Sequence, residues 1–188
     1  MYNIIYADPP WKFGSKMKAG RQQLGARAHY NEMPTKEICE LPIWQIADED
    51  CVLLMWTTDA HIPDAIKVMN AWGFKYKTVA FIWLKKEMSG KQVCYMGQWT
   101  MKNAEIVLLG TKGKMTQHLK SRKVRQLVEA KRNREKHSQK PQEIRDKIIE
   151  MFGNELPKVE LFARQKVDGW DAWGNEVESD INLVPKHV

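Results

Sequence analysis

Three features of this sequence predict an α/β fold, with a mostly parallel, doubly wound sheet and helices on both faces. Short apolar runs rich in β-branched and aromatic residues alternate with segments of helical periodicity, the pattern of strands joined by crossover helices. The first run, residues 2–7, is followed directly by an acid and two prolines, as expected of a buried strand that ends at a turn. The length of 188 residues and the hydrophobic content of 43% suit a globular chain with a sizeable core. We therefore expect a single domain over residues 1–188.

The segment Asp8-Pro9-Pro10-Trp11 ends the first predicted strand. Ligands of open α/β sheets bind at the carboxyl ends of strands, so the Asp8 carboxylate is expected at a ligand site. The prolines lack N–H donors and fix φ, which holds their carbonyls in one direction. An acid, the directed carbonyl of Pro9 and the flat ring of Trp11 suit a planar base that carries an amino group. An ordinary strand-to-turn segment has the same composition, so the motif alone leaves both interpretations open.

The later elements are predicted from apolar periodicity and from the residues that stop helices. Longer helices are expected at residues 62–72, before Gly73, and between Pro141 and Gly153. Further strands are expected at residues 51–56, 77–85, 104–109 and 158–163. The polar stretch 116–139 fits either a helix or disorder.

Shorter segments are predicted from local residue types. Thr35 is the candidate N-cap of a short helix that ends before Pro42. Thr58 or Asp59 is the candidate cap of the element after the second strand. Residues 14–27 contain three glycines and little apolar periodicity, which indicates a loop over the site.

The net charge of +7 is concentrated in two basic stretches, predicted as loops at residues 12–29 and 112–140. Residues 12–27 hold five basic residues and no acidic one, and residues 112–140 hold eleven basic residues against two acidic ones. A lone basic run is commonly a solvated helix face, but two such runs favour a polyanionic partner. We predict a nucleic-acid channel whose candidate contacts are Lys12, Lys16, Lys18, Arg21, Arg27, Lys120, Arg122, Lys123 and Arg125.

Several other classes of protein are disfavoured. Cys39, Cys51 and Cys94 are too widely spaced for a disulfide framework or a zinc site, so we expect no metal. No apolar run is long enough to cross a bilayer, and the first residues show no secretion signal. We therefore expect no membrane association and an intracellular, cytoplasmic location. No G-x-G-x-x-G follows a strand, so the common dinucleotide fingerprint is absent.

The last clear strand, residues 158–163, carries two charged residues near its end. Glu160 suits hydrogen bonds from ribose hydroxyls, and Arg164 suits a carboxylate or hydroxyls. The alternative is a surface salt bridge at a strand end, which contributes little.

A series of sequence blocks in this order resembles one family closely. It is the N6-adenine methyltransferase family typified by the catalytic subunit of the eukaryotic messenger-RNA adenosine methyltransferase, whose small phage and bacterial members are thought to act on DNA. The blocks cover nearly the whole chain: residues 7–11, 29–33, 53–56, 72–74, 82–85, 97–99, 137–141, 159–164 and 170–176. The resemblance implies a Rossmann-like class I S-adenosylmethionine methyltransferase fold with permuted motif order, in which the catalytic motif comes first and the cofactor strand last.

The resemblance also implies roles for individual residues. The catalytic positions, which hold the target amino group, are Asp8, Pro9, Pro10 and Trp11. The positions around S-adenosylmethionine are Asp8, Lys140, Glu160, Arg164, Asn175 and Glu176. The positions on the substrate side are Trp11, Tyr30, Trp83 and Lys140. The chain differs from eukaryotic members at Ala163, where they have Gly, at residues 165–166, where they have His-Asn, and at Glu176, where they have Gln.

We therefore predict transfer of a methyl group from S-adenosylmethionine to the N6 amino group of adenine in DNA. The same reaction on RNA is the alternative, and the small size without added RNA-binding modules favours DNA. A third hypothesis is a catalytically inactive, nucleic-acid-binding partner subunit. The intact segment 8–11 argues against that hypothesis, because inactive partners in this family lose it. No obligatory protein partner is implied, and both a monomer and a homodimer are open.

Overall fold

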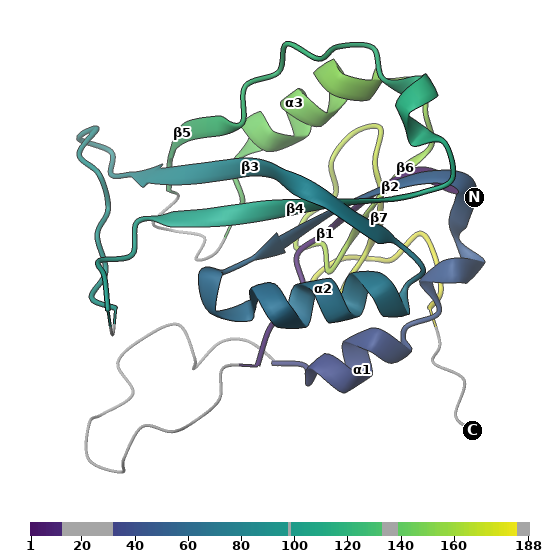
Figure 1. Ribbon diagram of the computed structural model, residues 1–188, viewed down its shortest axis with the longest axis horizontal. Helices are drawn as coiled ribbons and strands as arrows, with labels where there is room; N and C mark the ends of the chain where they lie inside the picture. Colours follow the sequence, from purple (N-terminus) through teal and green to yellow (C-terminus); the bar gives the residue numbers. More distant parts are fainter. Residues whose placement is uncertain (13–31, 98, 133–138, 184–188) are drawn as a thin grey trace.

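The computed structural model describes residues 1–12, 32–97, 99–132 and 139–183. Within these ranges seven strands form one sheet in the order β5-β3-β4-β2-β1-β6-β7 (Figure 1). The strands are β1 (Tyr2–Ala7), β2 (Ala47–Thr57), β3 (Lys75–Lys86), β4 (Ala104–Lys112), β5 (Leu127–Lys131), β6 (Lys158–Leu161) and β7 (Asp171–Trp173). The α-helices are α1 (Thr35–Glu40), α2 (Ile62–Ala71) and α3 (Gln142–Phe152). Single 3₁₀ turns are η2 (Ile43–Gln45), η3 (Asp59–His61) and η4 (Met115–His118).

The sheet is mostly parallel. β1 lies between β2 and β6 and is parallel to both, and β6–β7 and β3–β5 are also parallel pairs. β4 is antiparallel to both of its neighbours, β2 and β3. All described strands except β4 therefore run in the same direction and end at the same edge of the sheet. This brings the end of β1 beside the ends of β2 and β6. This arrangement confirms the predicted α/β class and its mainly parallel sheet.

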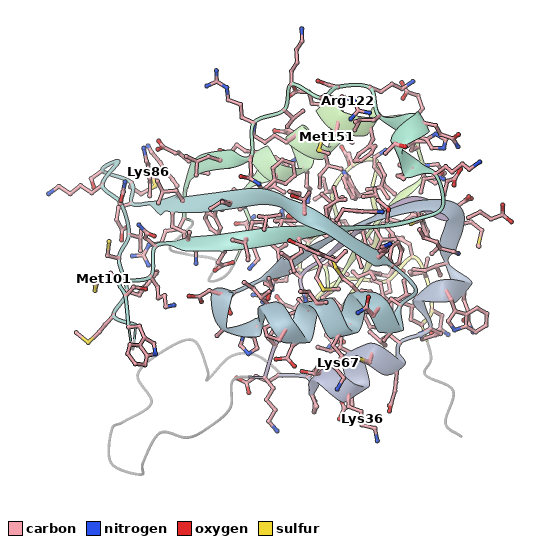
Figure 2. The ribbon with its side chains drawn as sticks, in the orientation of Figure 1. Lys36, Lys67, Lys86, Met101, Arg122 and Met151 are labelled. Carbon is pink, nitrogen blue, oxygen red and sulfur yellow. The ribbon has the colours of Figure 1, made fainter. Side chains whose placement is uncertain are left out.

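Two apolar clusters cover the two faces of the sheet, because successive side chains of a strand point to opposite faces. Ile5 and Ala7 of β1 pack with residues of α1 and α2 on one face. Ile4 and Tyr6 pack on the other face with residues of α3. Figure 1 shows α1 and α2 on one side of the sheet and α3 on the other. The outer surfaces of α1 and α2 are solvated, as the outward-pointing Lys36 and Lys67 in Figure 2 illustrate.

Parts of the predicted secondary structure were wrong. The stretch 112–140, expected to be a basic loop, contains η4 and β5. β5 buries only Val128 and Ala130 between exposed residues, so its pattern is too short to stand out. Asp171–Trp173, which forms β7, was not predicted as a strand either.

The predicted cap at the start of α1 was also wrong. Pro34 occupies the N-cap position, and Thr35 is already helical. The Thr35 hydroxyl instead donates to Asp64 at 3.1 Å, which connects α1 to α2. Thr58 does occupy the N-cap position of η3, but without a side-chain cap hydrogen bond. Among the described residues, no helix is both long and apolar enough to cross a membrane.

Candidate active site

Asp8 follows β1 directly and lies where the central parallel strands end. Its backbone N–H donates to the Leu161 carbonyl of the neighbouring β6 at 3.3 Å, so the parallel pairing continues up to the acid. The next two carbonyls are also engaged: that of Pro9 accepts from the Trp11 N–H, and that of Pro10 accepts from the Met33 N–H, each at 2.9 Å. A carbonyl oxygen has two lone pairs, so Pro9 keeps one acceptor site. The turn is thus held on both sides.

Trp11 anchors the motif to the next strand. Its indole N–H donates to the Trp56 carbonyl of β2 at 3.0 Å, and its ring stacks on His61 with 5.9 Å between centroids. Only 7% of Trp11 is exposed. The Trp56 indole in turn donates to the Tyr6 hydroxyl at 2.6 Å. Trp11 is therefore a buried residue that connects the turn to β2. The predicted stacking of Trp11 on a target base stays a prediction.

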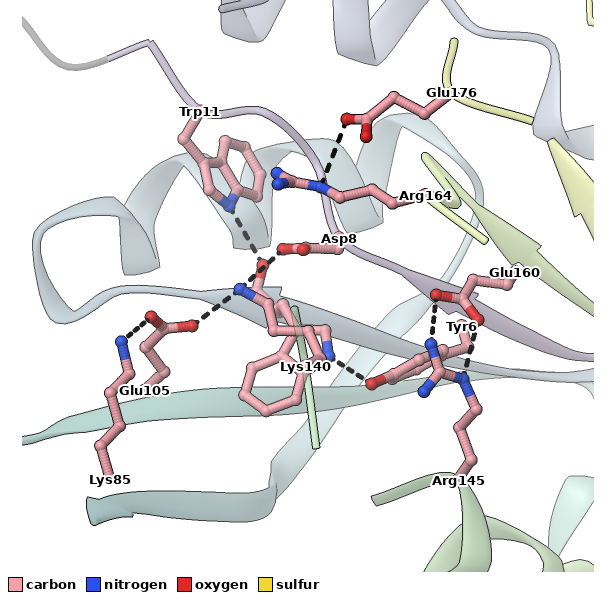
Figure 3. Close-up of polar contacts among 11 residues, drawn as sticks. Tyr6, Asp8, Trp11, Lys85, Glu105, Lys140, Arg145, Glu160, Arg164 and Glu176 are labelled. Carbon is pink, nitrogen blue, oxygen red and sulfur yellow. Dashed lines mark hydrogen bonds and ion pairs between the residues drawn. The ribbon is translucent and has the colours of Figure 1, made fainter. Parts of the chain in front are cut away.

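Four side chains of alternating charge connect β1, β3, β4 and the start of α3 (Figure 3). The Lys140 ammonium lies 3.1 Å from Asp8 Oδ1 and 2.8 Å from Glu105 Oε2. The other oxygen of Glu105 pairs with Lys85. Less than one fifth of each of these side chains is exposed. We call this set the charge chain: Lys85, Glu105, Lys140 and Asp8.

Burial and the alternating charges set the protonation of the charge chain. Burial raises the pKa of Asp8 above its ordinary value; Lys140 opposes this rise and Glu105 adds to it. Burial would also raise the pKa of Glu105, but attraction to Lys140 and Lys85 lowers that pKa to about 2. The pKa of Lys140 is raised despite burial, because two carboxylates face the ammonium. Lys140 is therefore charged, whereas the raised pKa of Asp8 makes this carboxylate easier to protonate than an ordinary aspartate.

A pocket of about 500 Å³ opens beside Asp8, at the ends of β6 and β7. Its polar lining includes the predicted cofactor residues Asp8, Arg164, Asn175 and Glu176. Arg164 Nε lies 3.8 Å from Glu176 Oε1 across this lining. The volume falls within the range of ordinary small-molecule sites. We call it the cofactor-side pocket.

Two backbone features shape the wall of the cofactor-side pocket. Phe162 has a φ of 61°, a left-handed conformation that side chains rarely adopt and that turns the chain sharply after β6. Its ring meets Trp173 edge-on at 5.3 Å, and both residues line the pocket. A Cβ at Gly174 would collide with the Ala163 backbone, so only glycine allows these two segments to approach so closely. The wall is thus fixed by a strained residue and a glycine.

Glu160 points away from the cofactor-side pocket. Both of its carboxylate oxygens accept hydrogen bonds from Arg145 of α3, at 2.7 and 2.8 Å, and the Arg145 guanidinium lies 5.4 Å from the centre of the Tyr6 ring (Figure 3). Burial raises the pKa of Glu160, while Arg145 opposes the rise. The predicted contact between Glu160 and a ribose therefore stays a prediction, and the observed partner is Arg145.

Other predicted residues fall in different places. Trp83 is 2% exposed, and its indole donates to the Ala130 carbonyl at 3.0 Å, so it belongs to the core. Lys12 is exposed directly after Trp11. The predicted contacts Tyr30, Lys16, Lys18, Arg21 and Arg27 lie outside the described residues.

The second basic stretch lies on the α3 side of the sheet. Lys120, Arg122, Lys123 and Arg125 are exposed. The backbone N–H of Lys120 donates to the Met151 carbonyl at 2.7 Å, near the carboxyl end of α3 (Figure 2 shows Arg122 above Met151). Lys140 lies just before the amino end of the same helix. The structure therefore does not bring these four basic residues next to Asp8, although Lys140, at the end of the same stretch, is paired with it.

Sequence reasoning missed three residues around the site: Lys85, Glu105 and Arg145. Glu105 is an acid near the start of β4, and Lys85 lies near the end of β3. Charged residues are rarely buried unless they are paired, so an acid beside an apolar strand run is a signal that could have been used. Within the described ranges, no cluster of three or more histidine, cysteine or acidic residues is arranged to hold a metal ion.

A family model described as MT-A70 matches residues 2–176. The chain belongs to the MT-A70 family. This membership confirms the family predicted from the sequence blocks, together with its methyltransferase fold. The order of the elements agrees with the implied permutation, because the Asp8 motif follows the first strand and the Arg164 turn follows the sixth.

Relatives in the MT-A70 family span bacteria and eukaryotes. The chain is 37% identical to a type II methyltransferase, M.MunI, of a Mycoplasma species, over 98% of this chain and 81% of the relative. It is 28% identical to the mouse N(6)-adenine-specific methyltransferase METTL4 and 26% identical to the N6-methyladenosine RNA methyltransferase MTA1 of Pyricularia oryzae. The matches span 94% of this chain in both cases, but only 37% and 47% of those relatives. Each of the three is a methyltransferase, which agrees with the predicted enzyme class.

Proposed function

We propose that this chain, working as one domain, transfers a methyl group from S-adenosylmethionine to the N6 amino group of adenine in DNA. One observation carries the proposal: a largely buried carboxylate, Asp8, follows the central strand directly and lines a ligand-sized pocket together with Pro10. Family membership and the adenine-specific relatives support the same reaction.

The residues of the cofactor-side pocket fit S-adenosylmethionine. Arg164, Asn175 and Glu176 supply donors and acceptors for hydroxyls and a nucleoside base, and Phe162 and Trp173 supply apolar surface. Lys140 is the residue that the family resemblance assigns to the methionine carboxylate, and its ammonium pairs here with Asp8 and Glu105. When bound, S-adenosylmethionine supplies an electrophilic methyl group on a positively charged sulfur.

Asp8 and Pro9 would act on the amino group of the target. The lone pair of an adenine amino group is delocalised into the ring, which makes the nitrogen a poor nucleophile. Hydrogen bonds from its two hydrogens to the Asp8 carboxylate and the Pro9 carbonyl would favour a tetrahedral nitrogen. The same acceptors would stabilise the positive charge that develops on it during attack. Lys140 and the rest of the charge chain hold the Asp8 carboxylate in place before the target arrives.

DNA is favoured over RNA as the substrate. The relative that shares 37% identity is a type II methyltransferase, whereas the relative named for RNA shares 26%. The same reaction on RNA is the second candidate function, because that relative matches over 94% of this chain. A nucleic-acid partner also agrees with the net charge of +7.

Mass spectrometry of nucleosides tests the reaction and the polymer together. The protein is incubated with isotope-labelled S-adenosylmethionine and either DNA or RNA, and the digested nucleosides are analysed. We expect labelled N6-methyladenine in DNA, and none with the Asp8→Asn variant. Label only in RNA would replace DNA as the substrate, and label on cytosine or on protein would overturn the proposal.

A further inference from the structure

A second pocket, of about 560 Å³, lies between the end of β2 and the segment that joins β3 to β4. Its lining includes Asp59, Tyr95, Trp99, Lys102 and Glu105. Glu105 belongs to the charge chain, so the pocket is connected to Asp8 through the ion pairs of Glu105 with Lys140 and of Lys140 with Asp8. We call it the loop-side pocket.

The β3–β4 segment presents large apolar side chains to solvent beside the loop-side pocket. Trp99 is 89% exposed and Met96 is 90% exposed, and Tyr95, Met88 and Met101 are also exposed. Figure 2 shows Met101 at the end of this segment, away from the body of the sheet. Exposed apolar groups gathered in one place mark a binding surface. This surface is continuous with the charge chain through the pocket.

The β3–β4 segment is held in place by specific contacts. Tyr95 and Lys102 exchange two backbone hydrogen bonds of 2.7 Å, and the Lys102 side chain pairs with Asp59 just after β2. A Cβ at Gly97 would collide with the Thr100 carbonyl, so glycine is needed for the turn that carries Trp99. The position of Trp99 over the pocket is therefore built into the fold.

The charges around the loop-side pocket are largely balanced. Lys85 pairs with Glu105, Lys102 pairs with Asp59, and the neighbouring Arg132 pairs with Glu87. Lys85 and Arg132 also lie within 6 Å of the centre of the Tyr95 ring, at 5.8 and 5.7 Å, which steadies this aromatic side chain. Lysines that are already paired are poor phosphate ligands. The pocket therefore suits a flat, neutral group that stacks on aromatic rings.

We propose that the loop-side pocket holds an unpaired nucleobase next to the target adenine in the same strand, stacked on Trp99 and Tyr95. The proposal rests on the proposed function, because it assumes a nucleic-acid strand at Asp8. Asp8 does not line this pocket, so the base within it is not the one that is methylated. The carboxylate oxygens of Asp8 and Glu105 that share the Lys140 ammonium, at 3.1 and 2.8 Å, are at most about 6 Å apart. That short span is compatible with two successive nucleotides of one strand, which lie ~3.4 Å apart along the helix axis when stacked.

The Trp99→Ala variant tests this inference, with Trp44→Ala as the matched control. Trp44 is also exposed, at 59%, but it lies in η2, just before the start of β2. The loop-side pocket is at the other end of β2, so Trp44 does not line it. Binding of a fluorescent single-stranded oligonucleotide is measured by anisotropy at several salt concentrations. We expect Trp99→Ala to weaken binding about 5- to 150-fold, the range for one lost stacking contact, and Trp99→Phe to retain most of the affinity. The salt dependence stays unchanged, because no phosphate contact is lost. Trp44→Ala binds like the wild type.

Other outcomes separate this inference from the proposed function. Wild-type affinity in Trp99→Ala overturns the loop-side pocket as a base site, even where the enzyme still methylates adenine. A flatter salt dependence would show a phosphate contact instead. A change in mass by light scattering, without a change in oligonucleotide affinity, would make this surface a self-association interface. If wild-type protein methylates no nucleic acid yet needs Trp99 for binding, the base site stands and the proposed function fails.

Discussion

Lys140 Nζ lies 3.1 Å from Asp8 Oδ1, although the two residues are far apart in the sequence. The pair connects the end of β1 to the start of α3, and Lys140 also pairs with Glu105 of β4. A carboxylate held by a buried ammonium is fixed in direction before any target arrives. It also keeps its second oxygen for the amino group of the target.

The first prediction concerns Asp8. Asp8→Asn keeps the size of the side chain but replaces one acceptor oxygen with an amide donor and removes the charge. We expect methylation to fall by at least 10²–10³-fold, the order of loss when one preorganised polar group at developing charge is removed. The rate of label transfer measures this, and circular dichroism checks that the variant is folded. Turnover near the wild-type rate would exclude Asp8 as the catalytic acceptor.

The second prediction is that Glu105 sets the pH at which activity is lost on the acidic side. Asp8 acts as a carboxylate, and burial together with the charge of Glu105 raises its pKa, so activity is lost as pH falls through that raised value. Glu105→Gln removes a negative charge from the charge chain, which lowers the pKa of Asp8. We expect the acidic limb of the kcat/KM profile to move to lower pH.

Glu129→Gln is the matched control for Glu105→Gln. Glu129 pairs with Lys86 of the same sheet but makes no contact with Lys140. The acidic limb of the kcat/KM profile of Glu129→Gln should coincide with that of the wild type. An unchanged limb in Glu105→Gln, or one that moves to higher pH, would contradict the role assigned to Glu105.

The third prediction separates the two possible roles of Glu160. Because its side chain is buried and paired with Arg145, Glu160→Ala leaves a buried cation and should lower the free energy of unfolding by about 3–5 kcal/mol. Replacing both residues, as in Arg145→Met with Glu160→Leu, should restore most of that loss, since apolar groups of similar size can replace a buried pair. Urea unfolding measures both.

Calorimetry with S-adenosylmethionine then tests the cofactor contact. If Glu160 also holds the ribose, the refolded double variant binds S-adenosylmethionine on the order of tenfold more weakly or worse, the expected loss of a charge-assisted hydrogen bond. Arg145→Met alone, which keeps Glu160, serves as the comparison. A double variant with wild-type affinity would leave Glu160 with a structural role only.

How far the sequence predicts the structure depends on the length and contrast of each pattern. Residues 51–56 are a continuous apolar run and residues 2–7 are apolar except for Asn3, and both were predicted as strands. β5 alternates exposed and buried residues over only five positions, and its charges hide it inside a basic stretch. Long, uniform patterns were therefore predictable, and short edge strands were not.

Similar limits apply to the site. Asp8, Arg164, Asn175 and Glu176 were predicted from sequence blocks, and the structure gathers them around one pocket. The ion pairs of Glu105 with Lys140 and with Lys85 were not predicted, because these residues come from different elements and meet only when the sheet forms. The pairing of Glu160 with Arg145 was hidden for the same reason. Local motifs can predict a ligand site, whereas long-range ion pairs need the register of the sheet.

The fourth prediction concerns the exposed basic stretch above α3. Replacing Arg122, Lys123 and Arg125 with Ala should weaken binding equally for all sequences, if nucleic acid contacts this side. The slope of log affinity against log salt should fall by about one for each lost phosphate contact. Three exposed lysines near α1 and α2, replaced together, are the control: Lys36, Lys67 and Lys75. An unchanged slope in the test variant would make this stretch a solvated surface.

The last prediction is that unpaired adenine is methylated faster than paired adenine. Asp8 lies at the end of β1 with 16% of its side chain exposed, so an adenine within a duplex cannot present its amino group there without swinging out, which costs a few kcal/mol. Stacking of the neighbouring base in the loop-side pocket returns about 1–3 kcal/mol, but in a duplex that base must be unpaired as well. We therefore expect kcat/KM, at fixed salt, to fall from a single-stranded to a mismatched to a fully paired form of one oligonucleotide. A strong preference for the fully paired form at one defined site would require a groove-reading element, because contacts at Asp8 and Trp99 alone reward a base that is already free.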